Sequence, residues 1–156
     1  MRIYIPATGV DIGRDALLPR TVHAVTDELR DLLPGDVEEV LEAVAMNAAT
    51  DESLRVLAAL AASGETVYPL RVVIAAEIEE GKTAHIEGDD ILPPALQLVE
   101  PVGWEDVVSF HVDDAEAAND VVLAIGGDAA ALERVTDDED LMWFDVEERG
   151  RLIEYF

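Results

Sequence analysis

The chain has 156 residues, which is the size of one ordinary domain and long enough to bury a full hydrophobic core. It contains no cysteine, which excludes disulfides, thiolate metal sites and cysteine nucleophiles and favours a cytoplasmic location. With 35 acidic and 10 basic residues, the net charge is −25. Because such a surface repels phosphate backbones and anionic lipids, we expect no nucleic-acid partner and no membrane partner. No apolar run approaches the ~20 residues that span a bilayer.

The first part of the chain predicts two short strands. Residues 2–6 alternate, with Ile3 and Ile5 on one face and Tyr4 on the other, and residues 21–25 form the second candidate strand. Thr26 is then expected to cap a brief helix that must end before Pro34.

Two helices are predicted next, joined as a hairpin. Asp36 and Glu39 have the spacing of a capping box at the start of a helix over 36–48. Thr50 is expected to cap a second helix, which Gly64 ends. Because only residues 47–50 separate the two helices, we expect them to pack against each other.

The strongest strand signal covers residues 70–78, where apolar side chains fill one face and part of the other, so we expect this strand near the centre of the sheet. Residues 79–82 read as a turn, after which 83–86 return as a weak hairpin arm. Residues 96–99 are a further strand candidate.

The clearest local unit follows at residues 107–126, where a strand, a cap, a helix and a stop are all readable. Val108, Phe110 and Val112 alternate with polar residues, as in a strand with one buried face. Asp113 with Glu116 then reads as an acidic capping box, and Gly126 as the left-handed residue that ends the helix.

The last part of the chain predicts two more helices and one strand. Asp128 caps a small helix that runs to about residue 135, and residues 141–144 form a short apolar strand. Asp145 and Glu148 repeat the capping-box spacing before a terminal helix.

These elements predict an α+β fold in a single domain, residues 1–156, with a mixed sheet of four to six short strands and helices packed mainly on one face. A ferredoxin-like two-layer sandwich is the leading specific topology.

Four blocks of sequence carry a resemblance to a known family. They are Met1–Thr8, His23–Thr26, Phe110–Ala118 and Leu141–Phe144, in that order. Together they resemble an uncharacterised family of short bacterial proteins found in genomes of high GC content. The family has no assigned activity, so the resemblance implies one domain and transfers no catalytic residue and no cofactor.

Catalytic and metal motifs are missing from the sequence. His23, His85 and His111 are far apart, and no His-x-x-x-His or Glu-x-x-His spacing exists, so no metal site is predicted. Ser53, Ser63 and Ser109 lie outside any Gly-x-Ser-x-Gly elbow. We therefore predict no catalytic residue, no metal and no cofactor.

Four side chains are candidates for a ligand-binding cleft. Tyr4, His23, His111 and Trp143 all lie on predicted strands, and they would line one cleft if the strands brought them together. The sequence thus predicts a small acidic, non-enzymatic binding or interaction module with a protein or small-molecule partner, and leaves the oligomeric state open. The alternative is a small enzyme that uses His111 with Asp113 or Tyr4, although Asp113 is already explained as a cap.

Overall fold

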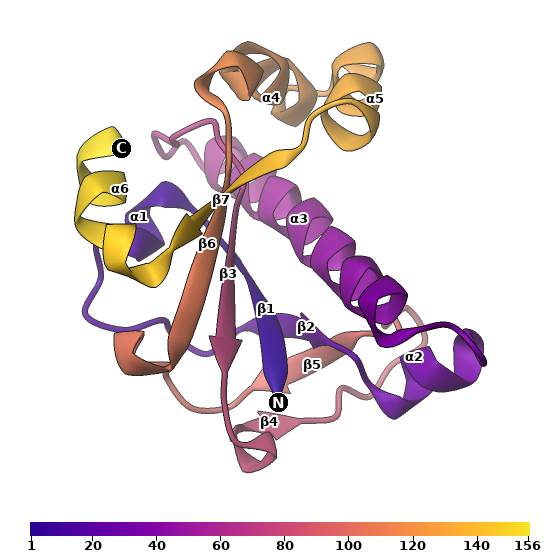
Figure 1. Cartoon of the computed structure of the whole chain (residues 1–156). Helices are drawn as coiled ribbons and strands as arrows, with labels where there is room; N and C mark the ends of the chain where they lie inside the picture. Colours follow the sequence, from indigo (N-terminus) through magenta and orange to yellow (C-terminus); the bar gives the residue numbers. More distant parts are fainter.

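All seven strands of the protein belong to one sheet, in the order β4-β5-β2-β1-β3-β6-β7, and every pairing is antiparallel (Figure 1). The computed structural model describes residues 1–156. The strands are β1 (Arg2–Ala7), β2 (Thr21–Ala24), β3 (Val72–Glu77), β4 (Thr83–Ala84), β5 (Ala95–Leu98), β6 (Val107–Asp113) and β7 (Leu141–Asp145).

Six α-helices accompany the sheet: α1 (Gly9–Ile12), α2 (Asp27–Leu32), α3 (Glu38–Ala62), α4 (Ala118–Ile125), α5 (Ala129–Asp137) and α6 (Arg149–Tyr155). Short 3₁₀ turns are η1 (Glu80–Lys82), η2 (Trp104–Asp106), η3 (Ala115–Ala117) and η4 (Val146–Glu148). None of the helices combines the length and the apolar character that crossing a bilayer requires.

The α+β class is confirmed, but the details of the predicted sheet are wrong. The sheet has seven strands rather than four to six, and it is antiparallel rather than mixed. A ferredoxin-like sandwich interleaves two β-α-β crossovers. Here α3 makes one crossover, from β2 to β3 over β1, whereas β6 and β7 are direct neighbours despite the helices between them. The strand order therefore departs from the ferredoxin-like pattern.

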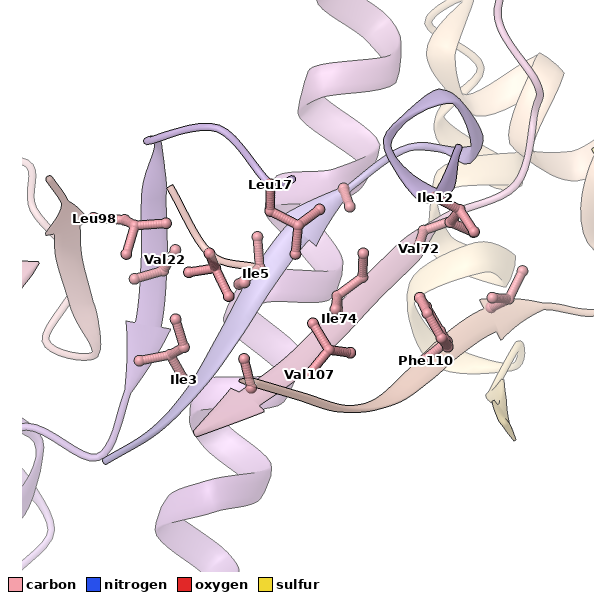
Figure 2. Packing of buried hydrophobic residues seen from close by; sticks show 14 of the residues in the cluster. Ile3, Ile5, Ile12, Leu17, Val22, Val72, Ile74, Leu98, Val107 and Phe110 are labelled. Carbon is pink, nitrogen blue, oxygen red and sulfur yellow. The ribbon is translucent and has the colours of Figure 1, made fainter. Parts of the chain in front are cut away.

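The larger part of the core lies on the face of the sheet that α3 does not cover. A cluster of 18 buried apolar residues gathers there, because alternate residues of each strand point to the same face. Figure 2 shows Ile3 and Ile5 of β1 beside Ile74 of β3 and Phe110 of β6. Ile12 of α1 and Leu152 of α6 complete the cluster, so these two helices close this side of the sheet.

The opposite face is crossed by α3. Its buried residues follow a four-residue spacing through small side chains, Ala45, Ala49 and Ser53, which lets the helix approach β1 and β3 closely. Helix α4 packs against its second half and α5 packs on α4, and Leu57 belongs to a buried cluster with Val121 and Val135.

Helix α3 is one continuous helix, so the predicted helical hairpin is wrong. Residues 38–62 contain neither glycine nor proline, and the alanines between the two expected helices favour helix strongly. Thr50 is not a cap: its hydroxyl donates to the carbonyl of Met46, one turn earlier, at 2.9 Å. The N-terminal cap position is Val37 rather than Asp36.

A buried polar contact fastens α3 to the sheet. The Ser53 hydroxyl donates to the Ala7 carbonyl at 2.7 Å and accepts from the Val72 amide at 3.0 Å. The Ser53 side chain therefore bonds to a carbonyl at the end of β1 and to an amide at the start of β3, which ties α3 to both strands.

Asp113 forms an ion pair in the core and does not cap the following helix. Its carboxylate accepts from Nε and Nη2 of Arg71 at 2.9 and 2.7 Å, and also from the Arg71 amide at 2.7 Å. Both side chains are almost completely buried. The cap of η3 is the next residue, Asp114, which accepts from the amide of Glu116.

Several other local predictions are confirmed. Thr26 and Asp128 cap α2 and α5, and Asp145 forms the expected capping box with Glu148.

Two other local predictions are wrong. The residue with positive φ after α4 is Gly127, not Gly126. Strand β4 exists, but it pairs with β5 instead of returning along β3, so the expected hairpin partner was wrong.

Candidate functional site

The four sequence-predicted site residues share one face of the sheet, the one that α3 crosses. Tyr4 of β1 lies directly opposite His23 of β2, and His111 of β6 lies directly opposite Trp143 of β7. Strand β3 runs between the two pairs. The sheet therefore brings the residues together as two neighbouring pairs on either side of β3, each with its own surroundings.

The pair on β6 and β7 lies beside the open edge of the sheet. Trp143 is 61% exposed, because β7 is an edge strand. His111 Nε2 is 3.2 Å from the hydroxyl of Ser109, its neighbour on the same face. Burial lowers the pKa of His111, and the positive charge of Arg2 lowers it further.

Asp113 and Tyr4, the two acid–base partners that the sequence suggests for His111, bond to or pair with other residues. The oxygens of Asp113 are taken by Arg71, and Tyr4 pairs with Ala75 and His23 instead of with a residue of β6. Burial, reinforced by the negative charge of Glu42, raises the pKa of the Tyr4 hydroxyl and keeps it protonated. Neither group is arranged as a general base beside His111.

His23 stands beside a cavity of about 400 Å³, which lies within the usual size range of small-molecule sites. The floor comes from Thr21 and His23 of β2 and from Ala95 and Gln97 of β5, which face the same side because of the β2–β5 register. One wall is formed by Glu52 and Arg55 of α3. The other is the segment between β4 and β5, which contributes four lining residues: Ile86, Asp90, Ile91 and Leu92.

The imidazole of His23 lacks hydrogen-bond partners within the protein. The residue is 1% exposed, and neither Nδ1 nor Nε2 is bonded to another protein group. Burial lowers the pKa of His23 to about 4; Glu52 opposes this shift and Arg55 adds to it. At neutral pH the ring is therefore uncharged, with one nitrogen that donates and one that accepts.

The charged wall of the cavity is held by a short ion pair. Arg55 Nη2 donates to Glu52 Oε2 at 2.7 Å across three residues of α3. Both side chains keep contact with solvent, so the pair is open to rearrangement when another charged group approaches.

Sequence reasoning found His23 but missed the residues around it. Glu52 falls inside the second predicted helix, and no element was predicted for the segment that contains Asp90 and Ile91. The alternation of Thr21 with His23 and of Ala95 with Gln97 was a usable signal. It becomes informative only when β2 and β5 are known to be neighbours.

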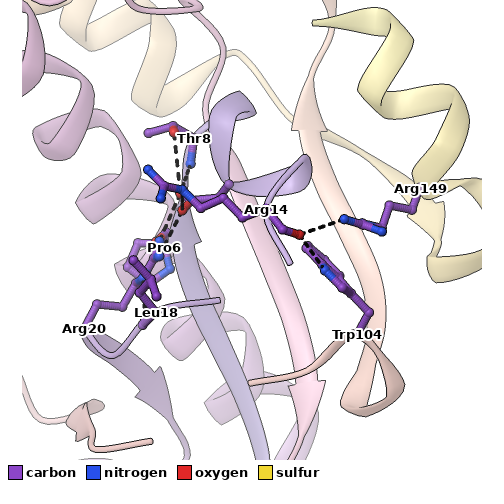
Figure 3. A network of polar contacts seen from close by, with 8 residues as sticks. Pro6, Thr8, Arg14, Leu18, Arg20, Trp104 and Arg149 are labelled. Atoms are coloured by element: carbon purple, nitrogen blue, oxygen red, sulfur yellow. Dashed lines mark hydrogen bonds and ion pairs between the residues drawn. The ribbon is translucent and has the colours of Figure 1, made fainter. Parts of the chain in front are cut away.

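A second hollow, of about 500 Å³, lies beside Arg14 and Arg20, but the guanidinium groups of these arginines already have partners within the protein. Both terminal nitrogens of Arg20 donate to the two oxygens of Asp11, at 3.0 and 2.9 Å (Figure 3). The Arg14 carbonyl accepts from Trp104 and Arg149, which fixes this loop. The arrangement is a structural network that joins the loop to α1 and α6.

A third hollow, between α3 and the segment before β7, is lined by Asp51, Asp137, Glu139 and Asp140 with Arg71 beneath them. No group of three or more His, Asp or Glu side chains in the protein is placed to hold a metal ion. Of the hollows, only the one at His23 combines ligand size with a buried polar side chain that has no partner.

Fold and site together define a single-sheet α+β protein with a cavity of ligand size beside a buried, uncharged histidine. Residues 1–153 match a family of unknown function, DUF6912, and the chain belongs to this family. The family resemblance seen in the sequence is thereby confirmed, while the bacterial, high-GC origin stays a prediction. Comparisons with curated proteins and with solved structures found no match.

Proposed function

We propose that this protein is a small acidic, non-enzymatic binding module whose ligand is a small molecule held in the cavity beside His23. The observation that carries this proposal is the hollow of about 400 Å³ beside His23, which polar and apolar side chains from β2, β5, α3 and the β4–β5 segment line. A buried polar group without a partner destabilises a fold by about 1–3 kcal/mol. His23 bears this cost at the floor of the hollow, where an apolar side chain would avoid it.

The cavity supports a binding role rather than catalysis. It offers donors, acceptors and apolar contacts from β2, β5, α3 and the β4–β5 segment, but no nucleophile next to a base. The alternative is a small enzyme that uses His111. Its strongest support is the contact of Ser109 with His111, a hydroxyl–imidazole pair of the kind that activates serine nucleophiles. Neither Ser109 nor His111 lines any of the three hollows described above, so this alternative is the weaker of the two.

The test is an NMR screen of the labelled protein against a library of small polar metabolites. We expect a bound compound to shift the ring resonances of His23 and the amides of Thr21 and Ile91. His23→Leu should weaken this binding, because it changes the shape of the cavity floor, and should at the same time stabilise the protein, because it removes an unsatisfied polar group. His85→Leu is the matched control, since the His85 side chain is 58% exposed and lies outside the cavity.

The two results for His23→Leu separate a binding role from a structural one. A histidine that only fills space would give a stabilised variant in which ligand binding is unchanged. That outcome, or a library in which no compound moves the cavity resonances, would overturn the proposal.

The proposal also includes a cytoplasmic location and no nucleic-acid or membrane partner. It is supported by the absence of cysteine and by the net charge of −25. A gel-shift titration at low salt tests the nucleic-acid part, and salt-sensitive binding in the micromolar range would contradict it.

A further inference from the structure

Strand β7 leaves one edge of the sheet unpaired. The sheet ends at β4 on one side and at β7 on the other, and β4 has two residues whereas β7 has five (Figure 1). Residues 141–144 of β7 are all apolar, and Trp143 at its centre is 61% exposed. The strand contains neither the proline nor the lysine that commonly protects a sheet edge, and its pairing with β6 has no bulge. Such an edge can pair with an additional strand.

The direction of the backbone groups in β6 follows from its contact with β3. The Asp113 amide donates to the Arg71 carbonyl at 3.1 Å, so Asp113 directs its backbone groups toward the β3 side. Directions alternate along an antiparallel strand, so Phe110 and Val112 direct their N–H and C=O groups toward β7. The bonds between β6 and β7 are therefore made at these two residues.

The groups that β7 turns to the open edge follow from the same register. The residues opposite Phe110 and Val112 bond to β6, so the alternate residues, Leu141, Trp143 and Asp145, turn outward. The Asp145 amide agrees with this, because it donates to Glu148 Oε2 at 2.9 Å instead of to β6. The N–H and C=O groups of Leu141 and Trp143 are thus left for an additional strand.

Acidic residues lie at both ends of β7. Residues 137–140 are four consecutive acids directly before the strand, and η4, directly after it, contains two more. Asp140 and Glu147 are exposed and form no ion pair. The first cation after the strand, Arg149, is held elsewhere, with its guanidinium 4.0 Å from the centre of the Trp104 ring and bonded to backbone carbonyls. A strand that approaches this edge therefore meets negative potential at both of its ends.

These charges discriminate between two candidate occupants of the edge. A second copy of the chain would pair its own β7 antiparallel about a two-fold axis. With Trp143 opposite its own copy, residues 138–140 of each chain would lie beside η4 of the other, so acids would face acids on chains that each carry a charge of −25. A strand with basic ends would instead place cations beside the same acids. The charges therefore select against a second copy and in favour of a basic segment.

We propose that the open edge of β7 binds an extended basic segment of a partner protein, which pairs with the N–H and C=O groups of Leu141 and Trp143 and carries lysine or arginine on both sides of an apolar centre. The apolar centre packs on the Trp143 side chain, and the basic residues face residues 137–140 and Glu147. Backbone pairing supplies affinity and the flanking side chains supply specificity. This surface is separate from the His23 cavity and does not rest on the binding function proposed for it.

The test uses three synthetic peptides. The first is Lys-Arg-Thr-Val-Thr-Val-Thr-Arg-Lys, the second has glutamate at its basic positions, and the third is the basic peptide with N-methyl groups on alternate central amides, which blocks strand pairing. Each is titrated into the labelled protein, and amide hydrogen exchange is measured. At about ten times its Kd, the basic peptide should slow exchange of the Leu141 and Trp143 amides about tenfold, because exchange then proceeds through the small unbound fraction. The other two peptides should not protect these amides at the same concentration.

Two double variants separate the charges beside β7 from the overall charge. Asp140→Asn with Glu147→Gln should weaken binding of the basic peptide at least about threefold. Asp31→Asn with Glu39→Gln is the matched control, because it removes the same charge from exposed positions on α2 and in the first turn of α3, away from β7 (Figure 1). It should cost less than about twofold, since distant exposed charges are screened. Trp143→Thr keeps a residue that favours strands and should weaken binding at least about fivefold.

Four outcomes would overturn the proposal. If the N-methylated peptide binds as tightly as the basic one, the contact is a general attraction to an acidic chain and strand pairing is wrong. If the acidic peptide binds equally well, or if the control variant weakens binding as much as Asp140→Asn with Glu147→Gln, the charge argument is wrong. If raising the concentration of the protein alone protects the Leu141 and Trp143 amides, the occupant is a second copy. If the basic peptide protects neither amide, the edge does not bind a basic strand.

Discussion

Removing the Asp113 carboxylate should leave the guanidinium of Arg71 charged and buried without its partner. Arg71 is 2% exposed and Asp113 is fully buried. Two nitrogens of Arg71 donate to the carboxylate, and Nη2 also donates to the Glu139 carbonyl at 3.0 Å. Asp113→Ala removes the carboxylate bonds and leaves the single carbonyl contact.

The expected cost is about 3–5 kcal/mol of unfolding free energy, because breaking a buried ion pair leaves an uncompensated charge. For a chain of this size the melting temperature should fall by roughly 6 to 20 °C. If Asp113 acted only as a helix cap, the cost would be about 0.5–2 kcal/mol. The two roles thus predict different magnitudes, which urea unfolding at 25 °C can resolve.

Two further variants make the assay decisive. Asp114→Ala removes the actual cap of η3 and should cost no more than about 2 kcal/mol. The double variant Arg71→Met with Asp113→Leu removes both charges and should recover most of the lost stability, because apolar replacement of a whole buried pair is often neutral or better. The reasoning is refuted if Asp113→Ala costs no more than Asp114→Ala, or if the double variant is less stable than Asp113→Ala.

Three further predictions concern the helix–sheet contact, pH and salt. Ser53→Ala should cost about 1–3 kcal/mol in urea unfolding, because it removes two buried hydrogen bonds between α3 and the sheet. Ser63→Ala, at an exposed hydroxyl, should cost much less, and equal effects would contradict this role. The pKa of His23 is 6.5 in the unfolded chain and about 4 in the folded protein. Between pH 6.5 and about 4 the unfolded chain binds a proton at His23 that the folded protein does not bind. As the pH falls through this range, the protein should therefore lose about 3 kcal/mol of unfolding free energy, and the His23→Leu variant should not show this loss. Identical pH profiles of the two proteins would contradict a buried neutral ring. Melting temperature should rise with sodium chloride up to ~1 M, because screening weakens repulsion on a surface of charge −25; a flat or falling trend would mean that the acids are compensated locally.

The sequence by itself determined the features whose cause lies within a few residues. Alternation over two-residue steps identified β3 and β6, because the period belongs to the strand itself. In β6 it placed Phe110 and Val112 correctly in the core, but a bulge puts Val107 there instead of Val108. The caps at Thr26, Asp128 and Asp145 were readable for a similar reason, since each side chain bonds to an amide two or three residues away.

Sequence patterns failed where a distant group competes for the same side chain. Asp113 follows a strand and precedes a helical turn, so its local pattern is that of a cap. Arg71 lies 42 residues earlier in the chain, and its guanidinium bonds to the carboxylate more strongly than a free amide would. The break expected at Thr50 failed in a related way: threonine is a cap only where the chain leaves the helix, and here the packing of Ala45 and Ala49 on the sheet keeps the helix continuous.

The candidate site was decided by the tertiary structure alone. The sequence pointed to His23, but the cavity exists because β5 pairs with β2 and α3 passes above them. His23 and Ala95 are neighbours across that pairing, and Glu52 reaches the same cavity from a helix. Backbone pairing between distant strands depends on how the whole sheet closes around its core, so no local pattern in the chain encodes which residues will meet there.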